Sequence, residues 1–406
     1  MADGITRIAV EGFKSISKKQ SIDIAPLTIL AGANSSGKSS IMQPLLMLKQ
    51  TLESTFDPGP LWIGGPNVKF TSTDQFLSKN GSQATNLTIE IATKHEEFCI
   101  TFQKDATGIQ IVRQRTGTKA GSVTLRPNMR PKEIADRLGL PNADWHVARN
   151  RFFLLVRGAG VASVEFTERD EPRIRGAIHV PGLRGSPSRT YPVTAVGTNF
   201  PGTFDYYVAS VIAHWQSKQS KDLDALNDDL RRLGLANRVS AHRLNEAEIE
   251  LQVTLSGRLD DIVSIVDVGF GVSQTLPVLT ALLAANESEL VYLEEPEIHL
   301  HPRAQVKLAD ILANAAKRGV RVVAETHSTL LLTAIQTLVA KGELKPELVK
   351  FHWFQRDPKT GVTKVTSTDL DENGAFSDSD WPEDFDSVIL SADNAYLDAV
   401  AERSHR

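Results

Sequence analysis

The feature that most constrains the fold of this chain is the stretch "LTILAGANSSGKSS" at residues 27–40. Gly32, Gly37, Lys38 and Ser39 have the spacing G-x-x-x-x-G-K-[ST], and the apolar run before Gly32 is typical of a buried strand. A strand that enters a helix here points successive backbone N–H groups into one concavity, at the positive end of the helix dipole. The pattern therefore predicts a phosphate-binding loop between a buried strand and a helix.

Each residue of this loop has an expected role. Lys38 reaches the β and γ phosphates of a nucleotide, and Ser39 ligates Mg²⁺ through its hydroxyl. We expect ATP as the nucleotide, because the sequence has no N/T-K-x-D segment of the kind that reads guanine. The predicted nucleotide-binding residues of the loop are Gly32, Ala33, Asn34, Ser35, Ser36, Gly37, Lys38, Ser39 and Ser40.

The C-terminal part of the chain has the pattern of alternating strands and helices. The run "LVYL" at 290–293 predicts a buried strand, the apolar positions between 308 and 315 predict one face of a helix that ends at Gly319, and "VRVVAE" at 320–325 predicts a second strand. We expect these strands to join the strand of the phosphate loop in one sheet. The predicted fold class is therefore α/β: a P-loop NTPase with a mixed sheet, a β-rich N-terminal lobe and a helical and loop insertion.

Within this single head we expect four parts. They are an N-terminal lobe with the phosphate loop at 1–115, a basic and partly helical insertion at 116–260, a lobe at 261–345 with the remaining motifs, and a β-hairpin with an acidic tail at 346–406.

Two acidic residues follow the first of the C-terminal strands. Glu294 and Glu295 stand at its carboxyl end, where unpaired carboxylates are costly to desolvate. A Mg²⁺-nucleotide supplies a reason for both: Glu294 can hold the metal, and Glu295 can orient and deprotonate the attacking water. The alternative is a pair of acids in a surface loop.

Histidines near these acids allow different interpretations. "AETHS" ends the next strand and places His327 at the same sheet edge, where a neutral imidazole can bind the γ-phosphate and report its loss; the alternative is a structural histidine. His299 and His301 are separated by one residue, but no Cys or further His cluster accompanies them, so we do not predict a zinc site there.

A glycine-rich segment, "VDVGFGVSQTLPVLTALL" at 266–283, precedes an apolar helix. Gly271 allows a close approach of the backbone, and Ser273 can cap the helix and leave N–H groups for an anion. The alternative is an ordinary glycine turn.

Charge is unevenly distributed along the 406 residues, although the formal net charge is only −4. Residues 111–191 contain 15 Lys and Arg against 7 Asp and Glu, whereas residues 369–406 contain 2 against 11. The single cysteine, Cys99, excludes an intrachain disulfide, and no apolar run approaches the length that spans a membrane. We expect a cytoplasmic protein with no membrane partner.

Several of these segments together resemble the ABC-type ATPase heads of the SMC, RecF and OLD superfamily. "GFKSI", "GANSSGKSS", "GFGVSQ", "LEEPEIHLHP" and "ETHS" occur in the order found in that superfamily, over about residues 5–75 and 262–390. The likeness is greatest to the small stand-alone bacterial ATPases without a C-terminal Toprim domain, in which a Trp-Pro segment, here "DWPEDF" at 380–385, lies near the C-terminus.

The resemblance implies roles for the matching residues. The Walker A loop is then 32–40, Glu294 and Glu295 form the Walker B pair, and His327 is the switch histidine. Gly271, Ser273 and Gln274 belong to the signature segment, which in the superfamily completes the ATP site of another subunit. The metal-facing Q-loop glutamine is Gln75, with Gln43 as the alternative. Glu294 departs from the usual aspartate, which suggests altered metal geometry and slow turnover.

The resemblance also implies a function, with three alternatives. The first is an ATPase that forms a homodimer or higher oligomer around ATP and Mg²⁺ and gates an effector such as a nuclease, in phage defence or DNA maintenance. The basic insert at 113–189 would then face DNA or the partner; the alternative is a solvated face balanced by the acidic tail. The second is a nuclease that binds Mg²⁺ through the acidic C-terminal tail. The third is a slowly hydrolysing, ATP-bound scaffold for a defence assembly.

Overall fold

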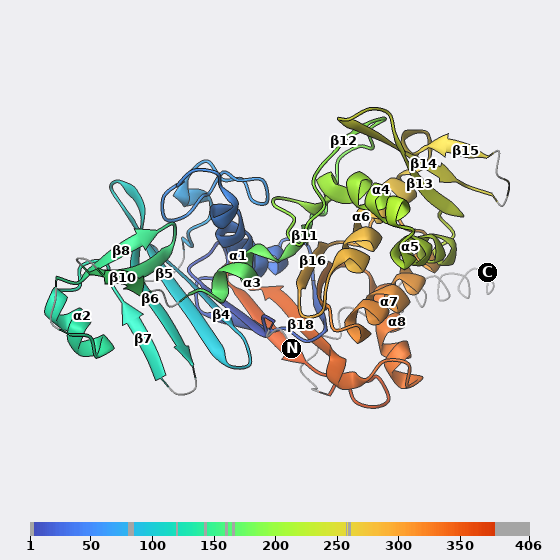
Figure 1. Cartoon of the computed structure of the whole chain (residues 1–406). Coiled ribbons are helices and arrows are strands. Elements are labelled where there is room, and N and C mark those ends of the chain that lie inside the picture. Colours follow the sequence, from blue (N-terminus) through green and yellow to red (C-terminus); the bar gives the residue numbers. More distant parts are fainter. Residues whose placement is uncertain are drawn as a thin grey trace, which may run out of the picture.

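The computed structural model describes residues 4–79, 85–118, 121–141, 144–158, 161–164, 167–256, 258 and 261–377. A central sheet joins two lobes, one made mainly of antiparallel strands and one made mainly of helices (Figure 1). The "DWPEDF" segment and most of the predicted acidic tail lie outside the described residues.

The central sheet has the strand order β11-β16-β17-β3-β18-β19. Its strands are β3 (Leu27–Gly32), β11 (Ile178–Val180), β16 (Leu290–Glu294), β17 (Arg321–Thr326), β18 (Val349–Arg356) and β19 (Thr363–Thr368). All neighbours are parallel except β18 and β19, which form an antiparallel pair. The sheet is mixed, as predicted for this α/β fold, and it draws its strands from distant parts of the chain.

Strand β3 is buried on both faces, as expected for the interior of a parallel sheet. Its side chains alternate: Ile29 and Ala31 belong to the hydrophobic core of the helical lobe, whereas Leu30 belongs to the core of the N-terminal lobe. The strand therefore lies where the two cores meet, and its carboxyl end is fixed from both sides.

The N-terminal lobe contains a six-stranded antiparallel sheet and a three-stranded one. The larger sheet consists of β1 (Arg7–Glu11), β2 (Gln20–Asp23), β4 (Asn86–Ala92), β5 (Glu96–Asp105), β6 (Gly108–Thr118) and β7 (Gly121–Leu125). The smaller sheet consists of β8 (His146–Asn150), β9 (Phe153–Gly158) and β10 (Val161–Val164). The lobe also contains α1 (Lys38–Glu53), η1 (Thr73–Gln75), α2 (Pro131–Leu138) and α3 (Asp170–Arg175).

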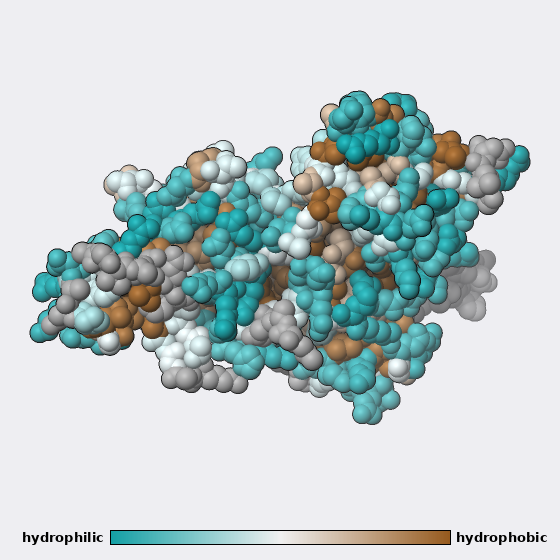
Figure 2. Space-filling view, in the orientation of Figure 1, coloured by the Kyte–Doolittle hydropathy of each residue, from teal (hydrophilic) through white to brown (hydrophobic). Residues whose placement is uncertain are grey.

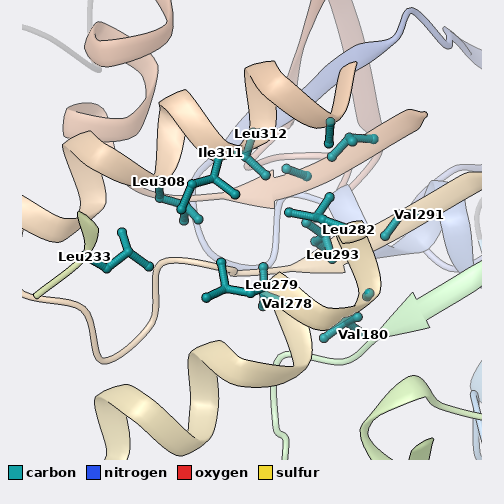
Figure 3. Packing of buried hydrophobic residues seen from close by; sticks show 14 of the residues in the cluster. Val180, Leu233, Val278, Leu279, Leu282, Val291, Leu293, Leu308, Ile311 and Leu312 are labelled. Carbon is teal, nitrogen blue, oxygen red and sulfur yellow. The ribbon is translucent and has the colours of Figure 1, made fainter. Parts of the chain in front are cut away.

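The helices of the second lobe pack against the face of the central sheet opposite to α1, and the lobe also contains a small sheet. The helical elements are η2 (Phe204–Tyr207), α4 (Val208–Lys218), α5 (Lys221–Arg232), η3 (Ile265–Asp267), α6 (Phe270–Ala284), α7 (Pro302–Lys317), α8 (Thr329–Ala340) and η4 (Pro346–Leu348). The strands are β12 (Tyr191–Pro192), β13 (Arg238–Arg243), β14 (Glu248–Thr254) and β15 (Ile262–Ser264). Figure 3 shows Leu279 of α6, Leu308 of α7 and Leu293 of β16 in the core that joins these layers.

The segment 116–260, which we expected as one insertion, is divided among several parts of the fold. Its first part carries the three-stranded sheet of the N-terminal lobe, β11 forms an edge of the central sheet, and α4 and α5 pack in the helical lobe. The three residues of β11 give too short a pattern to be recognised as a strand of the main sheet. Their parallel pairing with β16 places the loop that follows Val180 beside the end of that strand.

The surface seen in Figure 2 is mostly hydrophilic, with hydrophobic residues in small separate areas. Among the residues that the structure describes, no helix has both the length and the apolar character needed to cross a membrane.

Candidate functional site

The phosphate-loop residues form a tight turn between β3 and α1. Gly32 and Gly37 have φ angles of 146° and 105°, which side-chain-bearing residues rarely adopt. A Cβ at Gly32 would lie 2.3 Å from the carbonyl oxygen of Phe354, and one at Gly37 would lie 2.5 Å from Oγ1 of Thr363. Both glycines are therefore required by the backbone and by the β18–β19 hairpin packed against the loop.

Lys38 is buried at the start of α1, with 3% of its surface exposed. Its Nζ donates to the carbonyl oxygens of Gly32 and Ala33, at 3.0 and 3.1 Å, and lies 4.0 Å from a carboxylate oxygen of Glu325. Burial lowers the pKa of Lys38, while the nearby carboxylates oppose that shift. The ammonium is thus held inside the loop by weak neutral acceptors that a phosphate could replace.

Ser36 supplies a further test of whether the loop fits an anion. Its hydroxyl oxygen is buried and has no hydrogen-bond partner in the part of the chain that the structure describes. As in any helix, the first N–H groups of α1 have no acceptor within the helix. An orphaned hydroxyl, a buried ammonium and helix-terminal N–H groups together fit the phosphates of a nucleotide.

A cleft of about 990 Å³ opens in front of this loop, at the carboxyl edge of the central sheet. It is lined by Lys38, Glu295 and His327, so the structure brings together three residues that the sequence places far apart. Asn34, Ser35, Gly37, Ser39 and Ser40 also line it. The strands that deliver these residues, β3, β16 and β17, are parallel neighbours, and ligands bind at such carboxyl edges in open α/β sheets.

Glu295 is the first residue after β16 and has a φ angle of 44°. This left-handed turn takes the chain out of the strand, while the N–H of Glu295 still donates to the carbonyl oxygen of Glu325 at 2.8 Å. The side chain reaches the cleft, with its Oε1 3.7 Å from Nε2 of His327. Strained backbone at a non-glycine residue is common at functional sites.

His327 follows β17 and is held by Glu297, a residue of the "LEEPEIHLHP" segment for which we expected no role. The carboxylate of Glu297 accepts from the N–H of His327, at 3.2 Å, and from the hydroxyl of Thr326. Burial, followed by the charge of Lys38, lowers the pKa of His327, so its imidazole is neutral near pH 7. A neutral imidazole can both donate to and accept from groups around a phosphate.

Glu294 is not among the cleft residues. Its Oε1 lies 3.2 Å from Nε2 of His179 on β11, and its Oε2 accepts from the N–H of Gly182 at 3.0 Å. Although burial alone raises the pKa of Glu294, these hydrogen bonds hold it below its usual value. Glu294, the predicted metal carboxylate, is thus bound on the β11 side of β16. The phosphate loop follows β3, which lies on the other side of β16, beyond β17.

Glu325 occupies the position next to the phosphate loop; it belongs to the "ETHS" segment, in which we expected a role only for His327. Its Oε1 accepts from Ser39 Oγ at 2.9 Å, and its Oε2 accepts from the hydroxyl of Tyr292 at 2.8 Å. Burial raises the pKa of Glu325 to about 7. The signal that could have revealed it is its place at the end of a buried strand, immediately before Thr326 and His327.

The two candidate Q-loop glutamines both line the cleft. The side chain of Gln75 is engaged locally, since its Oε1 accepts from the N–H of Thr71 and its Nε2 donates to the Thr71 hydroxyl. Gln43, on α1, accepts from Nζ of Lys14 at 2.7 Å.

The signature segment lies at the start of α6, outside the cleft of its own chain. Gly269 is the N-cap, Phe270 is 56% exposed, and the Ser273 hydroxyl donates to the carbonyl oxygen of Phe270 at 3.2 Å. Gln274 is buried, and its amide donates to the carbonyl oxygen of Gly185 at 2.7 Å. Gly271 packs beside the carbonyl of His299, so the signature segment and the segment after β16 are neighbours.

Arg184 connects the signature helix to the end of β16, a role that the sequence did not reveal. Its guanidinium donates to the carbonyl oxygens of Gln274, Glu294 and Glu295, at 3.1, 2.7 and 3.1 Å. Burial lowers the pKa of Arg184 to about 10, against the opposing effect of the neighbouring glutamates, so the side chain remains charged. Arg184 therefore connects the start of α6 directly to the backbone of Glu295.

His301 has a structural place: it is the N-cap of α7, and its Nδ1 accepts from the N–H of Arg303 at 3.3 Å. No group of three or more His, Cys, Asp and Glu side chains suited to a metal ion occurs within the residues that the structure describes.

Many arginines of the basic segment form ion pairs within the chain. The pairs are Arg115–Glu97, Arg137–Glu133, Arg149–Asp57, Arg169–Glu96, Arg173–Glu96, Arg175–Glu171 and Arg189–Asp267. Their positive charge is therefore largely balanced by nearby carboxylates, most of them outside residues 111–191.

Comparisons with protein families match two separate segments of the chain to ATPase domains. Residues 4–151 match the model described as "AAA ATPase domain", and residues 209–333 match "AAA domain, putative AbiEii toxin, Type IV TA system". The comparison with curated proteins gave no match.

The solved structures that match this chain include heads of SMC proteins. The SmcHead bound to the C-winged helix domain of ScpA is 15% identical, with a TM-score of 0.52, and the match covers 91% of this chain and 98% of that one. The SMC head domain from Thermotoga maritima is 12% identical, with a TM-score of 0.42 and coverage of 89% and 98%. The Smc head domain with an extended coiled coil, bound to the C-terminal domain of ScpA and derived from Pyrococcus furiosus, is 14% identical, with a TM-score of 0.45 and coverage of 90% and 96%. The chain thus has the fold of an SMC head and matches AAA-type ATPase domains in both of its halves.

Proposed function

We propose that the chain binds ATP with Mg²⁺ in the cleft before the phosphate loop and hydrolyses it to ADP and phosphate. The observation that carries this proposal is the meeting of Lys38, Glu295 and His327 in one cleft at the carboxyl edge of the sheet. The matches of residues 4–151 and 209–333 to ATPase domains support it.

Each of these residues has its own role in ATP hydrolysis. Lys38 and the N–H groups of the loop bind the phosphates, and Mg²⁺, when bound, neutralises charge on the phosphate oxygens. Glu295 accepts a proton from water as the water oxygen attacks the γ-phosphorus and the bond to the bridging β–γ oxygen breaks. His327, neutral and 3.7 Å from Glu295, binds a γ-phosphate oxygen and loses that partner when phosphate leaves.

Dimerisation around the nucleotide belongs to the same proposal. Gly271 and Ser273 lie at the exposed start of α6, away from the cleft of their own chain, so they can meet a nucleotide only in a second copy. Arg184 then gives the second copy a route to the backbone of Glu295. Gln274 is bound inside the protein and we assign it no contact with nucleotide.

The cellular role that we propose is control of an effector protein. By resemblance, the nucleotide cycle gates an effector protein such as a nuclease, in phage defence or DNA maintenance. A direct DNA contact through the basic segment has less support, because many of its arginines are paired within the chain. If the segment does bind DNA, neutralising Arg126, Arg130 and Arg157 together should make the salt dependence of binding shallower, by about one unit of slope for each phosphate that is no longer neutralised.

The deciding experiment compares the parent protein with Glu295→Gln and Lys38→Ala. In single-turnover assays with labelled ATP, Glu295→Gln should bind ATP but release phosphate at least about 100-fold more slowly, and Lys38→Ala should bind no ATP. Sedimentation with ATP should show a dimer that persists only in Glu295→Gln. Equal retention of ATP by parent and Glu295→Gln would instead favour the ATP-bound scaffold.

A control addresses the nuclease alternative. Plasmid incubated with Mg²⁺ and the protein should stay intact; nicking that survives Lys38→Ala would move the activity away from the cleft and contradict the proposal.

A further inference from the structure

Two glutamates at strand ends, Glu294 and Glu325, could supply the carboxylate of the Mg²⁺ site in the proposed nucleotide cleft. Glu294 and Glu325 are cross-strand partners at the ends of β16 and β17, and both side chains lie on the α1 face of the sheet. Neighbouring strands are about 4.8 Å apart, so Glu325 is one strand from β3 and Glu294 is two. The acid that precedes Thr326 is therefore the nearer one to the phosphate loop.

The hydrogen bonds of the two glutamates likewise place Glu325, and not Glu294, at the phosphate loop. Glu325 accepts from Ser39, the residue whose hydroxyl is expected to ligate Mg²⁺, at 2.9 Å. Its second oxygen is held by Tyr292, which is fully buried, so the carboxylate is oriented from behind. The partners of Glu294 lie away from the phosphate loop: one oxygen is bound to His179 of β11 and the other accepts from the N–H of Gly182.

The donor set at Ser39 and Glu325 fits a hard cation. Mg²⁺ takes oxygen ligands at about 2.0–2.1 Å in octahedral geometry, so adjacent ligand oxygens lie about 2.9 Å apart. The Ser39 and Glu325 oxygens are separated by 2.9 Å. A serine hydroxyl that ligates a metal keeps its proton and can still donate to the carboxylate beside it.

We propose that Glu325 is the carboxylate of the metal site, and that Glu294 is a positioning residue that ties β11 and the loop after it to the end of β16. This assignment rests on the proposed nucleotide site. It explains why a glutamate is tolerated where the superfamily pattern has aspartate: the side chain at 294 reaches His179 and Gly182 rather than the metal.

The test measures Mn²⁺ binding by electron paramagnetic resonance in the presence of a non-hydrolysable ATP analogue. Glu325→Gln, which is nearly isosteric, should weaken Mn²⁺ binding by about 10–100-fold, whereas the matched variant Glu294→Gln should stay within about twofold of the parent. A tenfold loss in Glu294→Gln, with or without a loss in Glu325→Gln, overturns the assignment. Unchanged Mn²⁺ affinity in Glu325→Gln also overturns it.

Two further measurements keep the result interpretable. Binding of a fluorescent ATP analogue to the parent protein in the presence of Mg²⁺ is measured first: failure to bind it contradicts the proposed function itself, whichever carboxylate holds the metal. If Glu325→Gln does not fold by thermal unfolding, Glu325→Asp replaces it. That variant keeps the charge but withdraws it by one methylene, and it should weaken Mn²⁺ binding at least about threefold; unchanged affinity overturns the proposal.

Discussion

The hydroxyl of Ser39 donates a 2.9 Å hydrogen bond to Glu325, a residue 286 positions further along the chain. Ser39 is the second residue of α1 and Glu325 is near the end of β17, so the bond joins the phosphate loop to the strand that delivers His327. The bond holds the start of α1 against the end of β17 without the help of a nucleotide. The first prediction concerns its contribution to stability.

Replacing Ser39 with Ala should lower the free energy of unfolding of the nucleotide-free protein by about 1–3 kcal/mol, because a buried carboxylate loses a donor. Urea unfolding in EDTA measures the change. Ser217→Ala is the control, since the Ser217 hydroxyl makes only an exposed bond to the carbonyl oxygen of His214. Equal stability of both variants and the parent would show that the Ser39 bond contributes nothing.

Arg184 gives the second prediction. Arg184→Met leaves the three carbonyl oxygens that the guanidinium binds without that donor, at a cost of about 2–4 kcal/mol in unfolding free energy. ATP hydrolysis should fall as well, because the backbone of Glu295 loses its support. Arg189→Gln removes an exposed ion pair with Asp267 and should cost less than about 1 kcal/mol. A stable, fully active Arg184→Met protein would contradict this account.

The third prediction concerns Lys49 and Glu53, a buried ion pair inside α1. Nζ of Lys49 also donates to the carbonyl oxygen of Phe200, and Glu53 accepts from the N–H of Gly202, so the pair fixes the loop before η2 against the helix. Lys49→Met strands a buried carboxylate and should cost about 3–5 kcal/mol, whereas the double variant Lys49→Met with Glu53→Gln should cost clearly less. Chemical unfolding of the single and double variants gives the coupling energy, and additive losses would refute the prediction.

His352 gives a pH dependence. Its ring lies between the carbonyl oxygen of Asp23 and the hydroxyl of Ser367, and burial lowers the pKa of His352 to about 4. Between about pH 6.5 and pH 4 the unfolded chain takes up a proton at this residue that the folded protein does not, so stability falls as the pH falls through this window. The loss is at most about 3 kcal/mol.

The measurement compares melting temperatures of the parent and His352→Gln from pH 7.5 to pH 4.5. The amide of glutamine can still donate toward Asp23 but does not titrate. The difference between the two proteins should therefore change in favour of His352→Gln as the pH falls, and a constant difference would contradict the assignment.

The sequence predicts those parts of the site that depend on short local patterns. The spacing of Gly32, Gly37 and Lys38 needs only a strand, a turn and a helix, and the acids and histidine at strand ends are recognisable because parallel strands share one edge. Lys38, Glu295 and His327 do line one cleft. Their chemical roles stay predictions.

What the sequence does not reveal depends on tertiary contacts. Glu325 and Glu294 look alike as acids at strand ends, and only the strand order shows which one is adjacent to β3. Arg184 lies in a Gly- and Pro-rich loop where nothing marks it as buried, and β11 is too short to carry a pattern. Those positions are set by what packs against them, not by spacing along the chain.

The placement of β3 has a consequence for how the protein is made. Its only strand neighbours within the described chain are β17 and β18, which begin at Arg321 and Val349. During synthesis, this apolar strand must therefore remain with both edges open while almost 300 further residues emerge. Pairings so distant in sequence form slowly, and an unpaired strand edge favours association with other chains. Newly made copies should accordingly depend on chaperones more than mature protein does, and fragments ending before residue 320 should aggregate rather than hold the phosphate loop.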